Sequence, residues 1–183
     1  MTIHVTSARA TGLETKFVAL SGIAEMGVAG RIDGYASLFG EADQQGDVVM
    51  PGAFRLSLDR LAAASRKVKF LWQHDPTTPI GVWHHVAEDE KGLVVSGEIL
   101  TRVARGADAL ALMKAGAIDG LSIGYRTVKA EPNPATGGRN LHEIDLWEVS
   151  LVTFPMLPTA RAMLEEVTPS DVMELALAQA LDA

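Results

Sequence analysis

The stretch GLSIGYRTVKA, from Gly120 to Ala130, decides between two kinds of fold. Its first five residues match the glycine-any-serine-any-glycine pattern that carries the nucleophile of α/β-hydrolases, where the serine lies at a sharp turn between a strand and a helix. Here the residues after Gly124 continue with the alternation of a strand, so we expect Ser122 to lie within a strand. An α/β-hydrolase also places its histidine after the serine. The strongest histidine candidate here, His74, precedes it.

The segments on either side of this stretch are expected to be mostly strands joined by short turns. The expected strands cover residues 28–39, 67–74, 79–89, 92–100, 121–130 and 141–154. The expected helices cover 51–65, 102–116 with a C-cap at Gly116, and a short segment over 158–167. Short turns favour antiparallel pairing of consecutive strands. The predicted fold class is therefore α+β, an antiparallel sheet or barrel flanked by helices rather than a doubly wound parallel sheet.

Length and composition favour one globular domain. A chain of 183 residues can form a domain that buries about 70% of its unfolded surface, and is too short for two domains of ordinary size. Hydrophobic residues at 48% and charged residues at 21% argue against disorder. We assign the domain to residues 1–166 and expect a helical tail over 167–183, capped near Ser170, which is a candidate for removal.

Charge and residue usage narrow the possible partners. The net charge is −7, from 16 basic and 23 acidic residues, and the basic residues are scattered, so a phosphate backbone would be repelled. Cysteine is absent, which excludes disulfides and a thiolate nucleophile and is compatible with a reducing compartment. Neither a signal peptide nor a run of about 18 apolar residues is visible. We expect a cytoplasmic protein with neither nucleic acid nor membrane as a partner.

His74 is the first of three polar residues on strand faces that are otherwise apolar. Side chains alternate across a strand, so in KVKFLWQHD His74 shares a face with Val68, Phe70 and Trp72 and is expected on the buried side. For a single residue of this kind, a core histidine bonded to a backbone carbonyl is the commoner explanation.

Glu148 is the second such residue. In LHEIDLWEVSLVTF it shares a face with Ile144, Leu146 and Val152. A buried carboxylate without a partner is costly, so Glu148 needs a cation or several donors close by, and a histidine would supply one. The alternative is an edge strand protected from aggregation by a charge that points inward.

Ser122 is the third, with Gly120 and Gly124 on either side of it along the same face. The two glycines leave bare backbone beside the hydroxyl, which suits the close approach of a substrate peptide, although a β-bulge with an incidental serine is the alternative. A serine nucleophile needs a base, and the base needs a third group to hold it. We therefore predict that Ser122, His74 and Glu148 form a catalytic site.

With these residues placed, the sequence resembles the prohead maturation proteases of tailed bacteriophages, serine peptidases related in fold to the herpesvirus assemblin proteases. The resemblance is carried in order by GYASLFGEADQQGDVVMPGAF, FLWQHDPTTPIGVW, GLSIGYRTV and LWEVSLVTFPMLPTARA. It implies that His74 is the general base, Ser122 the nucleophile and Glu148 the third member, a position at which herpesvirus enzymes use a second histidine. It also implies a mainly antiparallel β-barrel surrounded by helices.

The resemblance further implies a serine endopeptidase that cleaves the major capsid protein, a scaffold protein or both inside the assembling procapsid, often followed by self-cleavage. The tail from about Val167 is then either a self-cleaved extension or a packing helix. No cofactor and no metal are expected, and a homo-oligomer is left open.

Two other functions compete with a serine peptidase. A metallohydrolase is disfavoured because His84 and His85 are adjacent on an expected strand and face opposite ways, and no His-Glu-x-x-His motif occurs. A capsid-assembly chaperone or scaffold that does not cut would account for the acidic charge and the helical tail. It would not account for a serine between glycines or for the two ionisable groups expected on buried faces.

Overall fold

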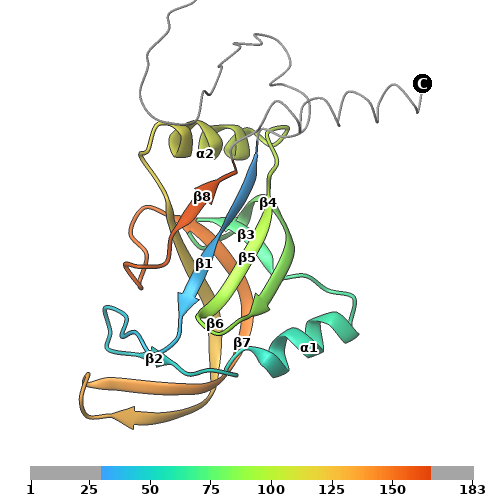
Figure 1. Cartoon of the computed structure of the whole chain (residues 1–183). Coiled ribbons are helices and arrows are strands. Elements are labelled where there is room, and N and C mark those ends of the chain that lie inside the picture. The colour runs from blue at the N-terminus through green and yellow to red at the C-terminus, as the bar shows by residue number, and fades with distance from the viewer. Residues whose placement is uncertain (1–29, 166–183) are drawn as a thin grey trace, which may run out of the picture.

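The computed structural model describes residues 30–165 of the chain, and Figure 1 shows their arrangement. These residues form one sheet with the strands β1 (Arg31–Leu38), β2 (Val48–Val49), β3 (Lys69–Trp72), β4 (Asp75–Glu88), β5 (Gly92–Ile99), β6 (Gly120–Asn133), β7 (Gly138–Val152) and β8 (Ala162–Leu164). The same range contains the helices α1 (Arg55–Ala63) and α2 (Ala104–Lys114). The predicted domain of residues 1–166 and the tail of 167–183 reach beyond the described part of the chain.

The sheet is mixed, although the consecutive strands that are joined by short turns pair antiparallel as predicted. The strands follow the order β2-β7-β3-β4-β5-β1-β8, and β6 pairs with β7. Antiparallel pairs join β3 to β4, β4 to β5, β1 to β5 and β6 to β7. The long strand β7 also pairs in parallel with β2 and β3. A mostly-sheet architecture with few helices is therefore confirmed for residues 30–165.

The predicted barrel is not confirmed, because the strand ladder does not close. Gly120 at the start of β6 forms an isolated bridge with Arg161, just before β8. This single residue pair is not a continuous ladder between the two strands.

The core contains buried side chains from most of the strands and from helix α2. Phe70 of β3 stacks on Trp83 of β4 with ring centroids 4.0 Å apart, and both side chains are almost fully buried. The Trp83 Nε1–H donates a hydrogen bond to the Val149 carbonyl oxygen at 3.2 Å. Burying one large apolar side chain contributes about 1.5–3 kcal/mol to stability, so this cluster fixes β3 and β4 against β7.

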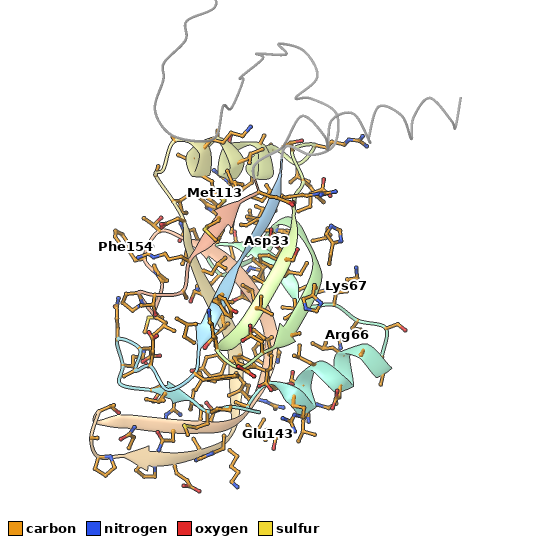
Figure 2. The ribbon with its side chains drawn as sticks, viewed as in Figure 1. Asp33, Arg66, Lys67, Met113, Glu143 and Phe154 are labelled. Atoms are coloured by element: carbon orange, nitrogen blue, oxygen red, sulfur yellow. The ribbon has the colours of Figure 1, made fainter. Side chains whose placement is uncertain are left out.

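Helix α1 covers part of β7 and β4. The hydroxyl of the buried Ser57 accepts a hydrogen bond from the Leu146 N–H at 2.9 Å, which joins the helix to the strand. An ion pair between Arg60 and Glu143 (3.7 Å) lies at the surface beside it, and Figure 2 shows Glu143 next to this helix. The helix predicted over 51–65 is therefore confirmed, over a shorter range.

Helix α2 lies across the other end of the sheet (Figure 1) and contacts β4 and β5. Ala109, Leu110 and Met113 form its buried side, and Met113 is labelled beneath this helix in Figure 2. Gly116 follows with a φ of 68°, the left-handed conformation that a glycine adopts most readily just past a helix end. The predicted cap at Gly116 is confirmed. None of the helices in residues 30–165 is long and apolar enough to cross a membrane.

The short helix predicted over 158–167 is wrong. Ala162–Leu164 form β8, which pairs antiparallel with β1. The segment has apolar residues at a helical spacing. Its backbone N–H and C=O groups instead find hydrogen-bond partners by pairing with the edge of β1. Gly34 makes the approach possible, since a Cβ at that position would lie 2.2 Å from the Arg161 carbonyl oxygen.

Candidate active site

The pairing of β6 with β7 determines where Ser122 lies. Ser122 is directly opposite Ser150, and Gly124 is directly opposite Glu148. Directly opposed residues of an antiparallel pair project to the same face, so the Ser122 side chain shares its face with Ser150 and Glu148. All three polar side chains belong to buried residues, with 5%, 0% and 8% of their surface exposed.

His74 reaches this face from the other side of β7. Strand β3 pairs in parallel with β7 and ends at Trp72, and the Gln73 N–H donates to the Leu151 carbonyl oxygen at 3.0 Å. Gln73 and His74 then adopt φ angles of 51° and 61°. Such left-handed conformations are uncommon for residues other than glycine, and they turn the chain so that the His74 ring comes back onto β7.

The buried position predicted for His74 is therefore wrong. The prediction assumed that strand alternation continues to residue 74, whereas the left-handed conformation of Gln73 and His74 ends it. The His74 side chain is 42% exposed.

The His74 ring contacts Glu148 directly. The distance between His74 Nδ1 and Glu148 Oε1 is 2.5 Å, which is that of a short, charge-assisted hydrogen bond. A carboxylate that accepts the Nδ1–H fixes the ring orientation and leaves Nε2 as the nitrogen able to take up a proton. It also stabilises the ring once the ring is positively charged.

The second oxygen of Glu148 has a partner of its own. The Ser150 hydroxyl donates to Glu148 Oε2 at 2.6 Å and accepts a hydrogen bond from the His74 backbone N–H at 3.1 Å. Ser150 thus contacts both members of the pair. With both oxygens bonded, the cost of burying the Glu148 carboxylate is offset.

Gly124 provides the space that Glu148 occupies. A Cβ at Gly124 would lie 2.0 Å from Glu148 Oε1. Gly124 therefore makes room for a carboxylate and does not only leave bare backbone for a substrate, and Ser150 has a role that was not predicted. The signal for Ser150 was present, because a residue two positions from Glu148 on a strand projects to the same face.

Ser122 lies at the edge of this cluster and lines a cavity of about 190 Å³. Among residues 30–165 no hydrogen bond joins its hydroxyl to His74. The structure thus brings His74 and Glu148 into contact and places Ser122 on the neighbouring strand, opposite the serine that contacts both. Within this described range, no group of three or more histidine, aspartate or glutamate side chains is placed to hold a metal ion.

Comparisons with known proteins agree on one family. The family model of the caudovirus prohead serine protease matches residues 21–173. The prohead protease of Enterobacteria phage HK97 is 38% identical over 131 residues, which cover 70% of this chain and 57% of that protein. The prohead protease of Escherichia phage T5 is 30% identical over 125 residues, which cover 68% of this chain and 58% of that protein. The chain thus spans little more than half the length of these two relatives.

A solved structure shows a related fold. The bacteriophage T4 capsid assembly protease superposes with a TM-score of 0.56 at 12% identity, over 67% of this chain and 80% of that chain. At this identity the similarity shows the fold alone.

Proposed function

The chain belongs to the family of caudovirus prohead serine proteases, and from this membership we propose that it is a serine endopeptidase that cleaves the major capsid protein, a scaffold protein or both during procapsid maturation. The observation that carries the proposal is the 2.5 Å contact between His74 and Glu148 beside the strand that holds Ser122. The site would act inside the assembling procapsid. Self-cleavage within the tail of residues 167–183 is part of the same proposal.

In the proposed reaction, Ser122 Oγ attacks the carbonyl carbon of the substrate peptide and His74 Nε2 takes the hydroxyl proton. The same nitrogen then donates that proton to the leaving amine, and water releases the acyl group by the reverse sequence. Glu148 accepts the Nδ1–H throughout and stabilises the charged ring. Catalytic hydrogen bonds are often formed only when the substrate is bound. The proposal requires that His74 Nε2 and the Ser122 hydroxyl come within hydrogen-bond distance when the substrate is bound.

We also infer that backbone hydrogen bonds outside the strand ladder complete a barrel near the nucleophile. Two backbone hydrogen bonds flank the isolated bridge, from Leu121 N–H to the Ala160 oxygen and from Ala162 N–H to the Asp119 oxygen, each at 2.9 Å. They support a closure that holds the start of β6, and with it Ser122, against the segment before β8.

Replacing Ser122 tests the function. Coexpression of the full chain with the capsid protein of the same phage genome should shorten the capsid protein, as measured by intact mass. Ser122→Ala should lower the rate by about 10⁴-fold or more without unfolding the chain, because the nucleophile is lost. Ser96→Ala, the same change on β5 outside the site, should cut normally. Capsid protein that keeps its mass with the unaltered chain would favour a non-catalytic assembly factor and contradict the proposal.

A further inference from the structure

The cavity beside Ser122 is built from segments that are distant in sequence. Strand β1, the loop 40–47 that leads into β2, the start of β6 and residues 156–157 all line it, and Figure 1 shows that loop leaving the end of β1. Its volume of about 190 Å³ is below the roughly 300–1,000 Å³ of pockets that enclose drug-sized ligands. A cavity of this size that opens at a nucleophile suits one side chain of a substrate.

The residues that line the cavity carry acidic groups and no basic ones. Glu41, Asp43 and Asp47 are among them, and no lysine, arginine or histidine is. Asp47 is neutralised by Arg139, whose Nη2 lies 2.5 Å from Asp47 Oδ2. Among residues 30–165 neither Glu41 nor Asp43 forms an ion pair. The cavity therefore has two carboxylates that form no direct ion pair within the described residues, although the charge of Arg139 also acts on Asp43.

Hydrogen bonds hold both of these carboxylates at the cavity. Glu41 Oε2 accepts from the Thr159 hydroxyl at 2.6 Å. Asp43 Oδ1 accepts from the backbone N–H groups of Gln45 and Asp47 at 2.8 Å and 3.0 Å. These donors are neutral, so they fix the positions of the carboxylates without cancelling their charge. Glu41 is exposed and Asp43 is half-buried.

The Ser37 side chain also lines the cavity, and the residue is 3% exposed. Its hydroxyl can donate a hydrogen bond to a ligand in the cavity or accept one from it. Burial raises the pKa of the nearby Tyr125 hydroxyl, the charges of Asp47 and Asp43 raise it further, and the charge of Arg139 opposes them.

We propose that this cavity binds a lysine or arginine side chain of the substrate, at the residue next to the bond that Ser122 attacks. This inference rests on the proposed function and adds a substrate class to it. A basic side chain would meet the charges of Glu41 and Asp43 and could donate to the Ser37 hydroxyl. An acidic side chain would be repelled, and an apolar one would offer Glu41 and Asp43 neither a charge nor a hydrogen bond.

A peptide library gives a direct test. A synthetic library of random-sequence peptides is digested with the full chain and, in parallel, with Ser122→Ala, and the new termini are identified by mass spectrometry. We expect lysine and arginine to be enriched at least tenfold at one position next to the cleaved bond, relative to the Ser122→Ala digest. Cleavage without such enrichment would overturn the cavity proposal and leave the proposed function intact. If neither the library nor the capsid protein is cut, both proposals fail.

Two isosteric substitutions test whether Glu41 and Asp43 cause the preference for a basic residue. Glu41→Gln and Asp43→Asn keep the oxygen atoms that accept the hydrogen bonds and remove the two charges. In matched peptides, the preference is the ratio of kcat/KM for a basic residue to kcat/KM for leucine at the tested position. The double variant should lower this ratio at least tenfold, mainly by raising KM for the basic peptide. Glu90→Gln with Asp108→Asn makes the same change in net charge at exposed positions that do not line the cavity, and it should keep the preference. An unchanged preference in the cavity variant would contradict the assignment.

Discussion

Gln73 and His74 turn the chain out of β3, and the position of the imidazole depends on that turn. Left-handed conformations at residues other than glycine cost on the order of 1–3 kcal/mol each and persist only where the surroundings hold them. Two hydrogen bonds do so here, from Gln73 N–H to the Leu151 oxygen and from His74 N–H to the Ser150 hydroxyl. Ser150 therefore supports the backbone of the proposed base as well as the carboxylate that orients it.

Replacing Ser150 with alanine should affect stability and cleavage together. The change removes the donor to Glu148 Oε2, in a buried hydrogen bond, and the acceptor of the His74 N–H, in a partly buried one. We expect the free energy of unfolding, measured by urea denaturation, to fall by about 1–3 kcal/mol. We also expect a lower kcat/KM and a shifted pH–rate profile, because the His74–Glu148 pair loses its restraint.

The comparison variant is again Ser96→Ala, a serine on β5 that does not contact the site. It should leave the pH–rate profile unchanged. A Ser150→Ala enzyme with normal kinetics would show that His74 and Glu148 keep their positions without this hydroxyl.

At the scale of elements, one ion pair joins the loop 40–47 to the start of β7. The Asp47 carboxylate accepts from the Arg139 backbone N–H at 2.8 Å and from its Nε at 3.1 Å, in addition to the contact with Nη2. The hydrogen bond from the Arg139 side chain lowers the pKa of Asp47 below its ordinary value of 3.8, although burial opposes the shift. The bidentate geometry keeps the loop, and one wall of the cavity beside Ser122, against the β6–β7 hairpin.

Acid should therefore weaken this contact. Because the pKa of Asp47 is lowered in the folded state, its stabilising contribution is present above the ordinary value and is lost as the pH falls through the folded value. Urea unfolding of the wild type and of Asp47→Asn, from about pH 7 to about pH 3, should give a difference in stability that is largest near neutrality and shrinks in acid. A difference that grows in acid would show that the carboxylate is not held in its charged form.

Local patterns predicted the strands and helices whose neighbours in sequence are also their neighbours in space. The helix cap at Gly116 and the antiparallel pairing of β3 with β4 and of β4 with β5 follow from turn residues and periodicity. The pairing of β1 with β8 and the parallel pairing of β3 with β7 could not be predicted in this way. Both join segments far apart in the chain, and the helical spacing of apolar residues in 158–167 predicted the wrong element.

In the site, too, local sequence patterns predict some features, and others depend on the tertiary fold. Ser122, His74 and Glu148 can be predicted as site residues because each is a polar residue in a segment with the alternation of an apolar strand face, although His74 itself lies just past the end of β3. The turn at Gln73 and His74 cannot be predicted, because no periodicity predicts a left-handed conformation at a glutamine or a histidine. The role of Gly124 as space for a carboxylate depends on the register of β6 against β7, which the sequence alone does not determine.

At the scale of the whole molecule, two contacts bring distant parts of the sheet together. Strand β8 pairs with β1, and the start of β6 forms a bridge with the segment before β8. Gly34 of β1 is the position where the backbone of residues 161 and 162 approaches closely. An added methyl group there would lie 2.2 Å from the Arg161 oxygen and 2.9 Å from the Ala162 Cα, and backbone atoms cannot rotate away as a side chain can. Gly34→Ala should therefore separate β8 from β1.

Amide hydrogen exchange can show whether separating β8 from β1 also loosens the start of β6. In Gly34→Ala we expect faster exchange at the Leu121 and Ala162 amides, whose hydrogen bonds flank the bridge, and a loss of stability of about 1–3 kcal/mol from overpacking. Gly40→Ala is the matched control, because nothing lies within 4 Å of its added methyl group. Its cost is limited to the left-handed backbone, so both amides should stay protected. If the Leu121 amide of Gly34→Ala exchanges at the same rate as in the wild type, β6 and β7 hold Ser122 in place by themselves. The proposed closure of the barrel would then have no part in positioning the nucleophile.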